Sequence, residues 1–232
     1  MRSAVTFSTI HFSQISGKTA LKLAIYPESP SPCPYASMDA GFFGWPLSED
    51  QVPTRLVAAP GFDSAALGDV RRMEWHFIFS ARAAETLRKF DLGCSRLTPV
   101  PLVDADGRDL PTGDFGQLHH LHVSERKDTL VPLTADKFKG LNRTRGLVSG
   151  WPKTEPGVIS VETEAEAGVD LWRDPMWNFG LFASARLVEA LKAANIGVGE
   201  FEWMPARRAT DEDRANAILE RQNHATLPLD QR

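Results

Sequence analysis

The sequence predicts an α+β protein with mixed and antiparallel sheets and helices, built around two related strand-helix-strand modules. Two observations carry this prediction. The stretch SARAAETLRKFDLGCSRLTPVP, residues 80–101, recurs as SARLVEALKAANIGVGEFEWMP, residues 184–205, without a gap. Each copy also follows a short apolar run typical of a strand, HFIF or GLFA. Hydrophobic residues make up 42% of the 232 residues, which is enough to build a core around both copies.

The similarity of the two copies exceeds what composition alone produces. At an offset of 104 residues, seven of the 22 aligned columns are identical, whereas ordinary residue frequencies predict about one or two. Gly44-Trp45-Pro46 and Gly150-Trp151-Pro152 precede the two copies at nearly equal spacing. We therefore expect a duplicated module.

Both copies predict the same helix. Ser80 and Ser184 are placed as N-caps, and Gly93 and Gly197 stand where the chain leaves the helix in a left-handed conformation. An apolar stripe at helical spacing marks the buried face of each helix. Its residues are Ala83, Ala84, Leu87 and Phe90 in the first copy and Leu187, Val188, Leu191 and Ala194 in the second.

The polar identities within the copies predict surface ion pairs. Arg82 and Glu85 stand three residues apart, as do Arg186 and Glu189, and this spacing lets the side chains meet on a helix surface. After the second helix, EFEWM alternates in the manner of a strand, with Phe201 and Trp203 on one face.

The segment before the first copy predicts strands and an irregular connection. Apolar residues alternate over residues 5–10 and 21–25 around the turn SGK, which predicts a hairpin. The stretch YPESPSPCPYASMDAG, residues 26–41, contains four prolines and predicts an irregular connection.

The remaining segments predict shorter elements. Between the copies, DADGRDLPTGD has turn chemistry, GQLHHLHVS predicts a strand, and TADKFKGLNRTRG predicts a short basic helix. TDEDRANAILERQ predicts a helix capped by Thr210. We divide the chain into an N-terminal strand-rich region at 1–69, a repeat-containing region at 70–206 and a helix with a loose tail at 207–232, all within one compact unit.

Composition narrows the range of partners and compartments. The formal net charge is −4, so the chain lacks the basic character of nucleic-acid-binding proteins. Its two cysteines, Cys33 and Cys94, lack CxxC spacing, as expected in a reducing compartment. No apolar stretch approaches the length of a signal peptide core or a membrane span. We expect a cytoplasmic protein with neither nucleic acid nor membrane as a partner.

The three histidines of QLHHLHV are the most enzyme-like feature. On a strand, His120 and His122 project to the same face and could share a metal ion. A third ligand would have to come from His76, Asp114 or Cys94, and no HExxH or CxxC pattern supports one. The alternative is that these histidines form local hydrogen bonds or face solvent. No nucleophile elbow, P-loop or dinucleotide fingerprint is present, so we expect no cofactor and no catalytic residue.

The segment before the second copy combines acidic and aromatic residues. In VETEAEAGVD, Glu162, Glu164 and Glu166 would form a row of carboxylates on one face of a strand, either a solvated face or a surface complementary to a basic partner. The following DLWRDPMWNF has the residue types of interface hot spots, although a buried junction uses the same residues. The candidate binding residues are therefore Glu162, Glu164, Glu166, Asp170, Trp172, Arg173, Asp174 and Trp177.

The chain resembles immunity protein family 11 of bacterial polymorphic toxin systems. The similarity covers roughly residues 70–206 and lies in LFASARLVEALKAANIGVGEFEWMP after DLWRDP, in the earlier FIFSARAAETLRKF, and in VPLVDADGRDL between them. The resemblance implies a cytoplasmic antidote that binds and neutralises a toxin domain encoded by an adjacent gene. It transfers no catalytic residue.

Three functional hypotheses follow. The first is an immunity protein that neutralises a secreted toxin by stoichiometric binding, without enzyme activity. The second is a small metal-dependent hydrolase or antidote enzyme that uses His120 and His122. The third is an intracellular adaptor with no toxin partner. The oligomeric state stays open.

Overall fold

The computed structural model describes most of the two repeats and parts of the flanking chain. The described residues are 5–9, 21–24, 44–48, 51–62, 64, 67–73, 76–131, 138–144, 147–152, 159–175, 177–197 and 201–217.

Two four-stranded sheets with the same strand order form the centre of the fold. The first is ordered β4-β5-β8-β6 and the second β12-β13-β1-β14. In each sheet the third strand runs antiparallel to both of its neighbours. The strands of the first sheet are β4 (Val70–Met73), β5 (His76–Phe79), β6 (Arg96–Val100) and β8 (Leu118–His122). Those of the second are β1 (Val5–Thr9), β12 (Leu171–Asp174), β13 (Trp177–Ser184) and β14 (Glu202–Pro205).

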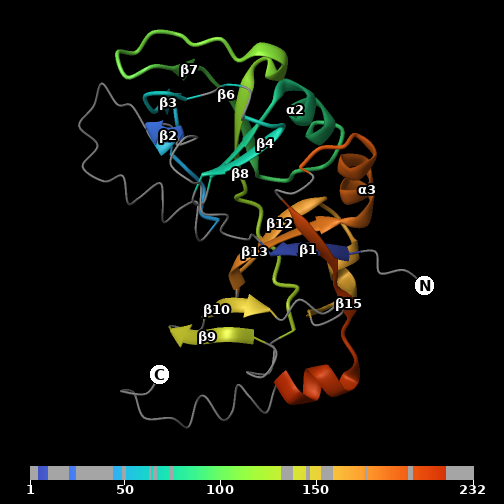
Figure 1. Ribbon diagram of the computed structural model, residues 1–232. Coiled ribbons are helices and arrows are strands. Elements are labelled where there is room, and N and C mark those ends of the chain that lie inside the picture. Colours follow the sequence, from blue (N-terminus) through green and yellow to red (C-terminus); the bar gives the residue numbers. More distant parts are fainter. Residues whose placement is uncertain are drawn as a thin grey trace.

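Each sheet carries one helix, which follows its second strand. Helix α2 (Ala81–Leu87) comes after β5, and α3 (Ala185–Ala193) comes after β13. We call β4, β5, α2, β6 and β8 the first module, and β12, β13, α3, β14 and β1 the second module. In Figure 1 the first module forms the upper part of the molecule and the second lies below it, with α2 and α3 on the same side.

One hydrophobic core joins the two modules. Phe77 and Phe79 of β5 lie in the same buried cluster as Leu181 and Ala183 of β13, and the apolar stripes of both helices contribute to it. Phe201 crosses from the second module to the first, where its ring centroid lies 5.8 Å from that of Phe77. The two modules therefore share their largest core.

The outer face of each sheet has a core of its own, covered by smaller sheets. The first sheet packs against β2, β3 and β7, and the second against the β11-β15 pair. A further hairpin, β9-β10, lies below the second module in Figure 1. These strands are β2 (Leu21–Ala24), β3 (Arg55–Ala58), β7 (Leu102–Val103), β9 (Phe138–Thr144), β10 (Leu147–Pro152), β11 (Ser160–Val161) and β15 (Arg207–Arg208).

Short helical segments also lie outside the two modules. Two are 3-10 helices, η3 (Gly113–Phe115) and η5 (Thr163–Glu166). Residues 211–217 form a helix whose first turn is capped, because Thr210 Oγ1 accepts from the Asp213 N–H at 3.2 Å. Within the described part of the chain, no helix has the length and apolar character that a membrane span needs.

The structure confirms the α+β class and the local chemistry of the repeats. Ser80 Oγ accepts from the Ala83 N–H at 3.2 Å, and Ser184 Oγ accepts from the Leu187 N–H at the same distance, so both are N-caps. The apolar stripes are buried except at their last residues, Phe90 and Ala194, which are half-buried. Gly93 and Gly197 do have positive φ angles, +58° and +70°. The prediction that they end the helices is wrong, because α2 is capped at Arg88 and α3 at Ala194.

Two predictions about segments outside the two copies are wrong. The strands at residues 5–9 and 21–24 do not pair with each other, because β1 pairs with β13 and β14 while β2 pairs with β3. Alternation predicts a strand but not its partner. Residues 138–144, expected within a short helix, form β9, because the adjacent β10 offers a hairpin partner that outweighs local helix propensity. Strands also cross both expected boundaries: β1 joins the second sheet and β15 pairs with β11.

Candidate functional site

Three histidines gather on the outer face of the first sheet. His120 and His122 project to the same side of β8, as the strand prediction requires, with ring centroids 6.4 Å apart. His76 of β5 joins them, and its Nδ1 lies 2.9 Å from His120 Nε2. Nε2 of His122 contacts the main-chain oxygen of Trp45 at 2.6 Å and therefore donates to it. We call His76, His120 and His122 the histidine cluster.

The histidine cluster is buried and electrically neutral. Each of its side chains is at most 4% exposed. Burial, together with the neighbouring His122 and the Arg173 guanidinium, lowers the pKa of His76 to about 4. Burial likewise lowers the pKa of His122 to about 4, against the opposing effect of its bond to Trp45, and holds the pKa of His120 well below its usual value.

This geometry serves internal hydrogen bonding. The nitrogens of His76 and His120 that face each other already share a hydrogen bond, so a metal ion would have to displace it. The described residues contain no group of three or more His, Cys, Asp or Glu side chains arranged to hold a metal ion. Of the suggested third ligands, only His76 lies in the cluster. Asp114 is exposed in η3, and Cys94 is exposed beside Glu125, whose hydrogen bond raises the pKa of the thiol.

The histidine cluster also fixes the segment at residues 44–48. His122 holds the carbonyl of Trp45, while Leu47 is buried. A β-carbon added to Gly44, which has a φ of +66°, would lie 2.8 Å from Arg173 Cδ. The indole of Trp45 is nevertheless 46% exposed. The cluster therefore links the first sheet to this segment beside the second module.

The acidic row does not lie on a strand. Strand β11 ends at Val161, and the chain then turns into η5, with the Ala165 N–H bonded to the Glu162 carbonyl at 3.0 Å. The prediction of three parallel carboxylates is therefore wrong, because burial of Ala165 favours a helical turn over continued extension. Glu164 is exposed, Glu162 is half-buried, and the side chain of Glu166 lies outside the described residues.

The aromatic and charged residues after the acidic segment are buried, so the prediction that they form an exposed binding surface is wrong. Trp172 and Trp177 are fully buried and pack on Phe182, with centroid separations of 5.7 and 5.9 Å. Arg173 and Asp174 are 2% exposed. The Asp174 carboxylate accepts from the N–H groups of residues 129 and 130, so it fixes a neighbouring segment of the chain.

Asp170 has a structural role that the sequence did not reveal. Its carboxylate accepts from the Ser184 hydroxyl, the Arg186 guanidinium and the Asp91 N–H. Burial opposes ionisation of Asp170, but these hydrogen bonds hold its pKa below the usual value. The carboxylate thus joins the start of β12 to the cap of α3 and to the first module. We call this set of contacts a clamp.

The first module contains the same clamp. Asp69, placed just before β4 as Asp170 is placed before β12, accepts from the Ser80 hydroxyl at 2.6 Å and pairs with Arg82. The expected pair of Arg82 with Glu85 is therefore wrong, and so is that of Arg186 with Glu189, because each arginine instead turns to the aspartate before its hairpin. A sequence signal existed, since Asp69-Val70 and Asp170-Leu171 both precede the first strand of a module.

The two clamps reach across the module interface in a reciprocal way. Arg82 of the first module donates to the Ala194 carbonyl at 2.6 Å. Arg186 of the second module lies over the Phe90 ring, 5.9 Å from its centroid. Arg82 corresponds to Arg186 and Phe90 to Ala194 at the repeat offset of 104. In an isologous dimer, residue i of one subunit contacts residue j of the other, and j contacts i in return. The two modules of this single chain contact each other in the same way.

An exposed acidic surface remains near the C-terminal helix. The Arg214 guanidinium bridges Glu162 and Asp211, at 2.9 Å from each. Glu164 and Glu212 are exposed. Two segments nearly 50 residues apart in sequence thus bring their carboxylates together around one arginine. We call Glu162, Glu164, Asp211 and Glu212 the acidic surface.

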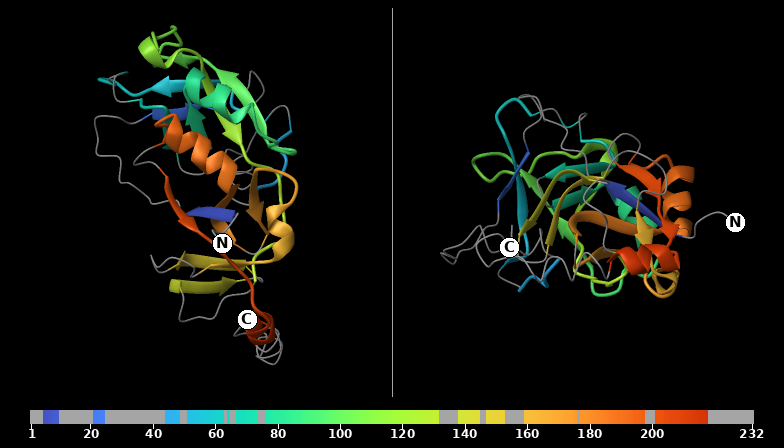
Figure 2. Two further views of the ribbon diagram at one scale, coloured as in Figure 1. Left: turned by 90° about the vertical axis from the view of Figure 1, so that its right-hand side faces the viewer. Right: turned by 90° about the horizontal axis from the view of Figure 1, so that it is seen from below.

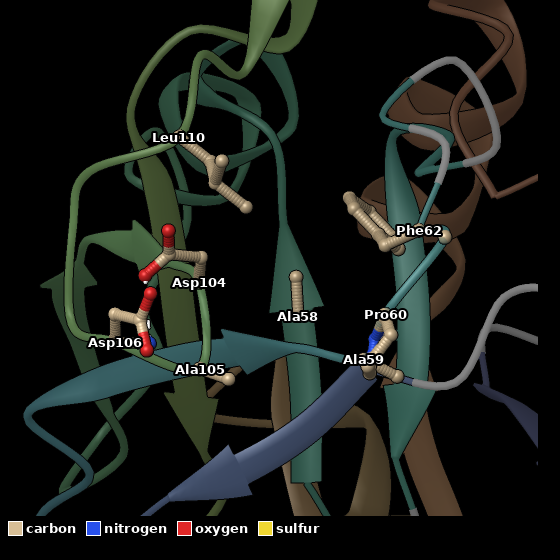
Figure 3. Close-up of a pocket in the computed structure, with 9 residues that line it drawn as sticks. Ala58, Ala59, Pro60, Phe62, Asp104, Ala105, Asp106 and Leu110 are labelled. Carbon is tan, nitrogen blue, oxygen red and sulfur yellow. Dashed lines mark hydrogen bonds between the residues drawn. The ribbon is translucent and has the colours of Figure 1, made fainter.

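A shallow pocket of about 280 Å³ lies at the other end of the molecule. It opens between the turn after β3 and the hairpin after β7 (Figure 3). Phe62 and Leu110 supply apolar walls, while Asp104 and Asp106 stand on the opposite side from Phe62. Both carboxylates are engaged by Arg108, and Asp104 also accepts from two N–H groups of its own turn. The turn chemistry predicted for this stretch is confirmed.

Comparison with known protein families and with curated proteins finds no match for the chain.

Proposed function

We propose that the protein is a cytoplasmic immunity protein that neutralises a cognate toxin domain by stoichiometric binding, without enzyme activity. The toxin would be encoded by an adjacent gene. The proposal rests on the resemblance of residues 70–206 to such immunity proteins. The observation that supports a binding role is the acidic surface, since it is assembled from two distant segments and presents exposed carboxylates.

The negative charge of the acidic surface favours a partner with a basic surface. Exposed carboxylates attract a basic surface and accelerate encounter with it, while their hydrogen bonds fix the register of the complex. Arg214 holds Glu162 in place, while Glu164 and Glu212 stay exposed. We therefore propose that the partner presents a basic patch to this end of the molecule.

The experiment is co-expression with the C-terminal domain of the neighbouring gene's product, followed by size-exclusion chromatography with mass detection. The paired charge reversal Glu164→Lys and Glu212→Lys is expected to weaken the complex by about tenfold or more, increasingly at low salt. The matched control reverses Asp109 and Asp114, two exposed carboxylates of the segment between β7 and β8. This segment lies at the opposite end of the molecule from the helix at residues 211–217 (Figure 2). Equal weakening by both pairs would show that only net charge matters and would overturn this choice of surface.

A hydrolase that used the histidine cluster would behave differently in the same experiment. The variant His122→Gln keeps a side-chain N–H that can donate to the Trp45 carbonyl but removes the imidazole. For a binding protein, it should leave both the complex and protection from the toxin intact. Loss of protection with the complex still formed would favour the metal-dependent enzyme. Protection without any complex would argue against stoichiometric binding.

A further inference from the structure

The two modules complete their sheets in different ways. In both sheets the third strand lies between the second and the fourth strands and forms backbone hydrogen bonds with both. In the first module this strand is β8, which follows β6 along the chain. In the second module the same place is taken by β1, which lies near the opposite end of the sequence. The second module is therefore incomplete within its own stretch of chain, residues 159–206.

Strand β1 is paired along both edges. Val5 to Thr9 stand opposite Ser184 to Gly180 of β13, and Thr6 to Thr9 stand opposite Pro205 to Glu202 of β14. Strand β14 has β1 as its single neighbour in this sheet. Removal of β1 would consequently leave two unpaired edges and would separate β14 from β13.

The loss would reach both cores of the second module. Met204 of β14 is buried in the outer core, and Trp203, together with the adjacent Phe201, packs against the core shared by the modules. The first residue of β1 stands opposite Ser184, the N-cap of α3 and a member of the second clamp. Strand β1 is thus placed to couple the sheet to the helix and the clamp.

Strand β1 is far in sequence from its partners β13 and β14, so its pairing has the largest entropic cost of loop closure in the second module. The pairing of Val5 with Ser184 closes a chain segment of about 180 residues, whereas the pairing of β6 with β8 closes a short one. Contacts of such long range form after local ones. The strand is therefore expected to add after the local contacts of β12, β13 and α3 have formed, as an extended peptide adds to an existing sheet edge in strand complementation.

We infer that the gap between β13 and β14 is a binding site for an extended strand, that the N-terminal segment is its ligand, and that the site accepts this segment when it is supplied as a separate peptide. The peptide pairs antiparallel to both neighbouring strands in the register of β1. This inference is independent of the proposed function, because it requires no toxin.

The test uses the chain without residues 1–10 and a synthetic peptide of residues 1–12. Hydrogen exchange is measured in β13 and β14 and, as an internal reference, in β5 and β8. We expect truncation to lower protection in β13 and β14 by at least about 100-fold, with a much smaller change in the first module. The peptide should restore protection with one-to-one saturation. A Phe7→Pro peptide should not, because proline lacks the N–H of a central strand.

A second form of the test keeps the whole chain, in case the truncated one does not fold. A protease site is inserted between Thr9 and Leu21, and the folded protein is then cleaved. The released segment should stay bound and should exchange with labelled peptide, but not with the Phe7→Pro peptide. The inference is overturned if the segment leaves while β13 and β14 remain protected, or if no peptide restores a protein that has lost it.

Discussion

The two modules share a topology and a clamp but differ on their outer faces. The first places the histidine cluster there, whereas the second places the Trp172-Trp177-Phe182 cluster. Both keep an aspartate before the hairpin and a serine and arginine at the helix start. The shared residues hold each module together and hold the modules to each other. The differences between the modules lie on these outer faces.

The largest expected effect tests whether the two clamps are equal. Asp170 has a side chain that is 1% exposed, whereas that of Asp69 is 19% exposed. Asp170→Ala would leave the Ser184 hydroxyl and the Asp91 N–H without their acceptor, and should lower the free energy of unfolding by about 3 kcal/mol. Asp69→Ala should cost about 1 kcal/mol. Urea unfolding monitored by circular dichroism measures both, with Asp109→Ala as a surface control. Equal costs would contradict this ranking of the two clamps.

The second prediction is that acid destabilises the first module before the second, because only the first has buried histidines on its outer face. The pKa values of His76 and His122 are about 4 in the folded protein, below the unfolded value of 6.5. Between pH 6.5 and 4 the unfolded chain therefore binds more protons than the folded protein. The free energy of unfolding is highest above pH 6.5, decreases as the pH falls towards 4, and changes little below that from this cause. Each histidine contributes at most about 1.4 kcal/mol per pH unit. Hydrogen exchange at pH 7 and 5 should show the loss first in β5 and β8.

The control for the pH prediction removes two of the three buried imidazoles, His76 and His120, while it keeps the fold. The double variant His76→Gln and His120→Leu keeps side chains of similar volume at both positions but removes their imidazoles. This variant should lose less stability between pH 7 and 5 than the unmodified chain. A pH profile that stays the same would show that carboxylates, and not the histidine cluster, govern acid unfolding.

Local chemistry was predictable from the sequence, and long-range pairing was not. The caps at Ser80 and Ser184 depend on residues within one turn, so their pattern sufficed. The partner of β1 depends on a strand about 180 residues away, which no local pattern encodes. The prediction of the arginine partners failed for a related reason. Arg82 has a plausible partner one helical turn away in Glu85, but in the folded hairpin it pairs with Asp69.

The same difference between local and long-range information explains why the predicted arrangement of the binding residues was wrong. Trp172 and Trp177 have the residue types of a hot spot and of a core, and only burial distinguishes the two. Likewise, the alternation in VETEAEAGVD predicts a strand, whereas the short β11-β15 pairing ends at Val161 and frees the chain to turn. Asp211 was missed because Arg214 links it to Glu162, which lies 52 residues from that arginine in the sequence.

A smaller effect tests whether the two caps are equivalent. Ser80 and Ser184 each accept from a helix N–H and donate to the aspartate of the clamp. Each Ser→Ala substitution should therefore lower the free energy of unfolding by about 1 to 2 kcal/mol, and by similar amounts in the two modules. Ser→Thr, which keeps the hydroxyl, should recover most of the loss. A cost confined to one module would show that the capping serine matters in only one copy.

The smallest expected effect decides between two partners for the same arginine. If the clamp is the partner of Arg82, Glu85→Gln should change the free energy of unfolding by less than about 0.5 kcal/mol, as should Glu189→Gln in the second module. A double-mutant cycle makes the comparison direct. Arg82→Met combined with Asp69→Asn should show a coupling of about 0.5 to 1 kcal/mol, whereas Arg82→Met combined with Glu85→Gln should show almost none. Because Arg82 is largely exposed, with 56% of its side chain accessible, the coupling should weaken as salt is raised. Coupling to Glu85 instead would mean that the helix surface, and not the folded-back hairpin, holds the arginine.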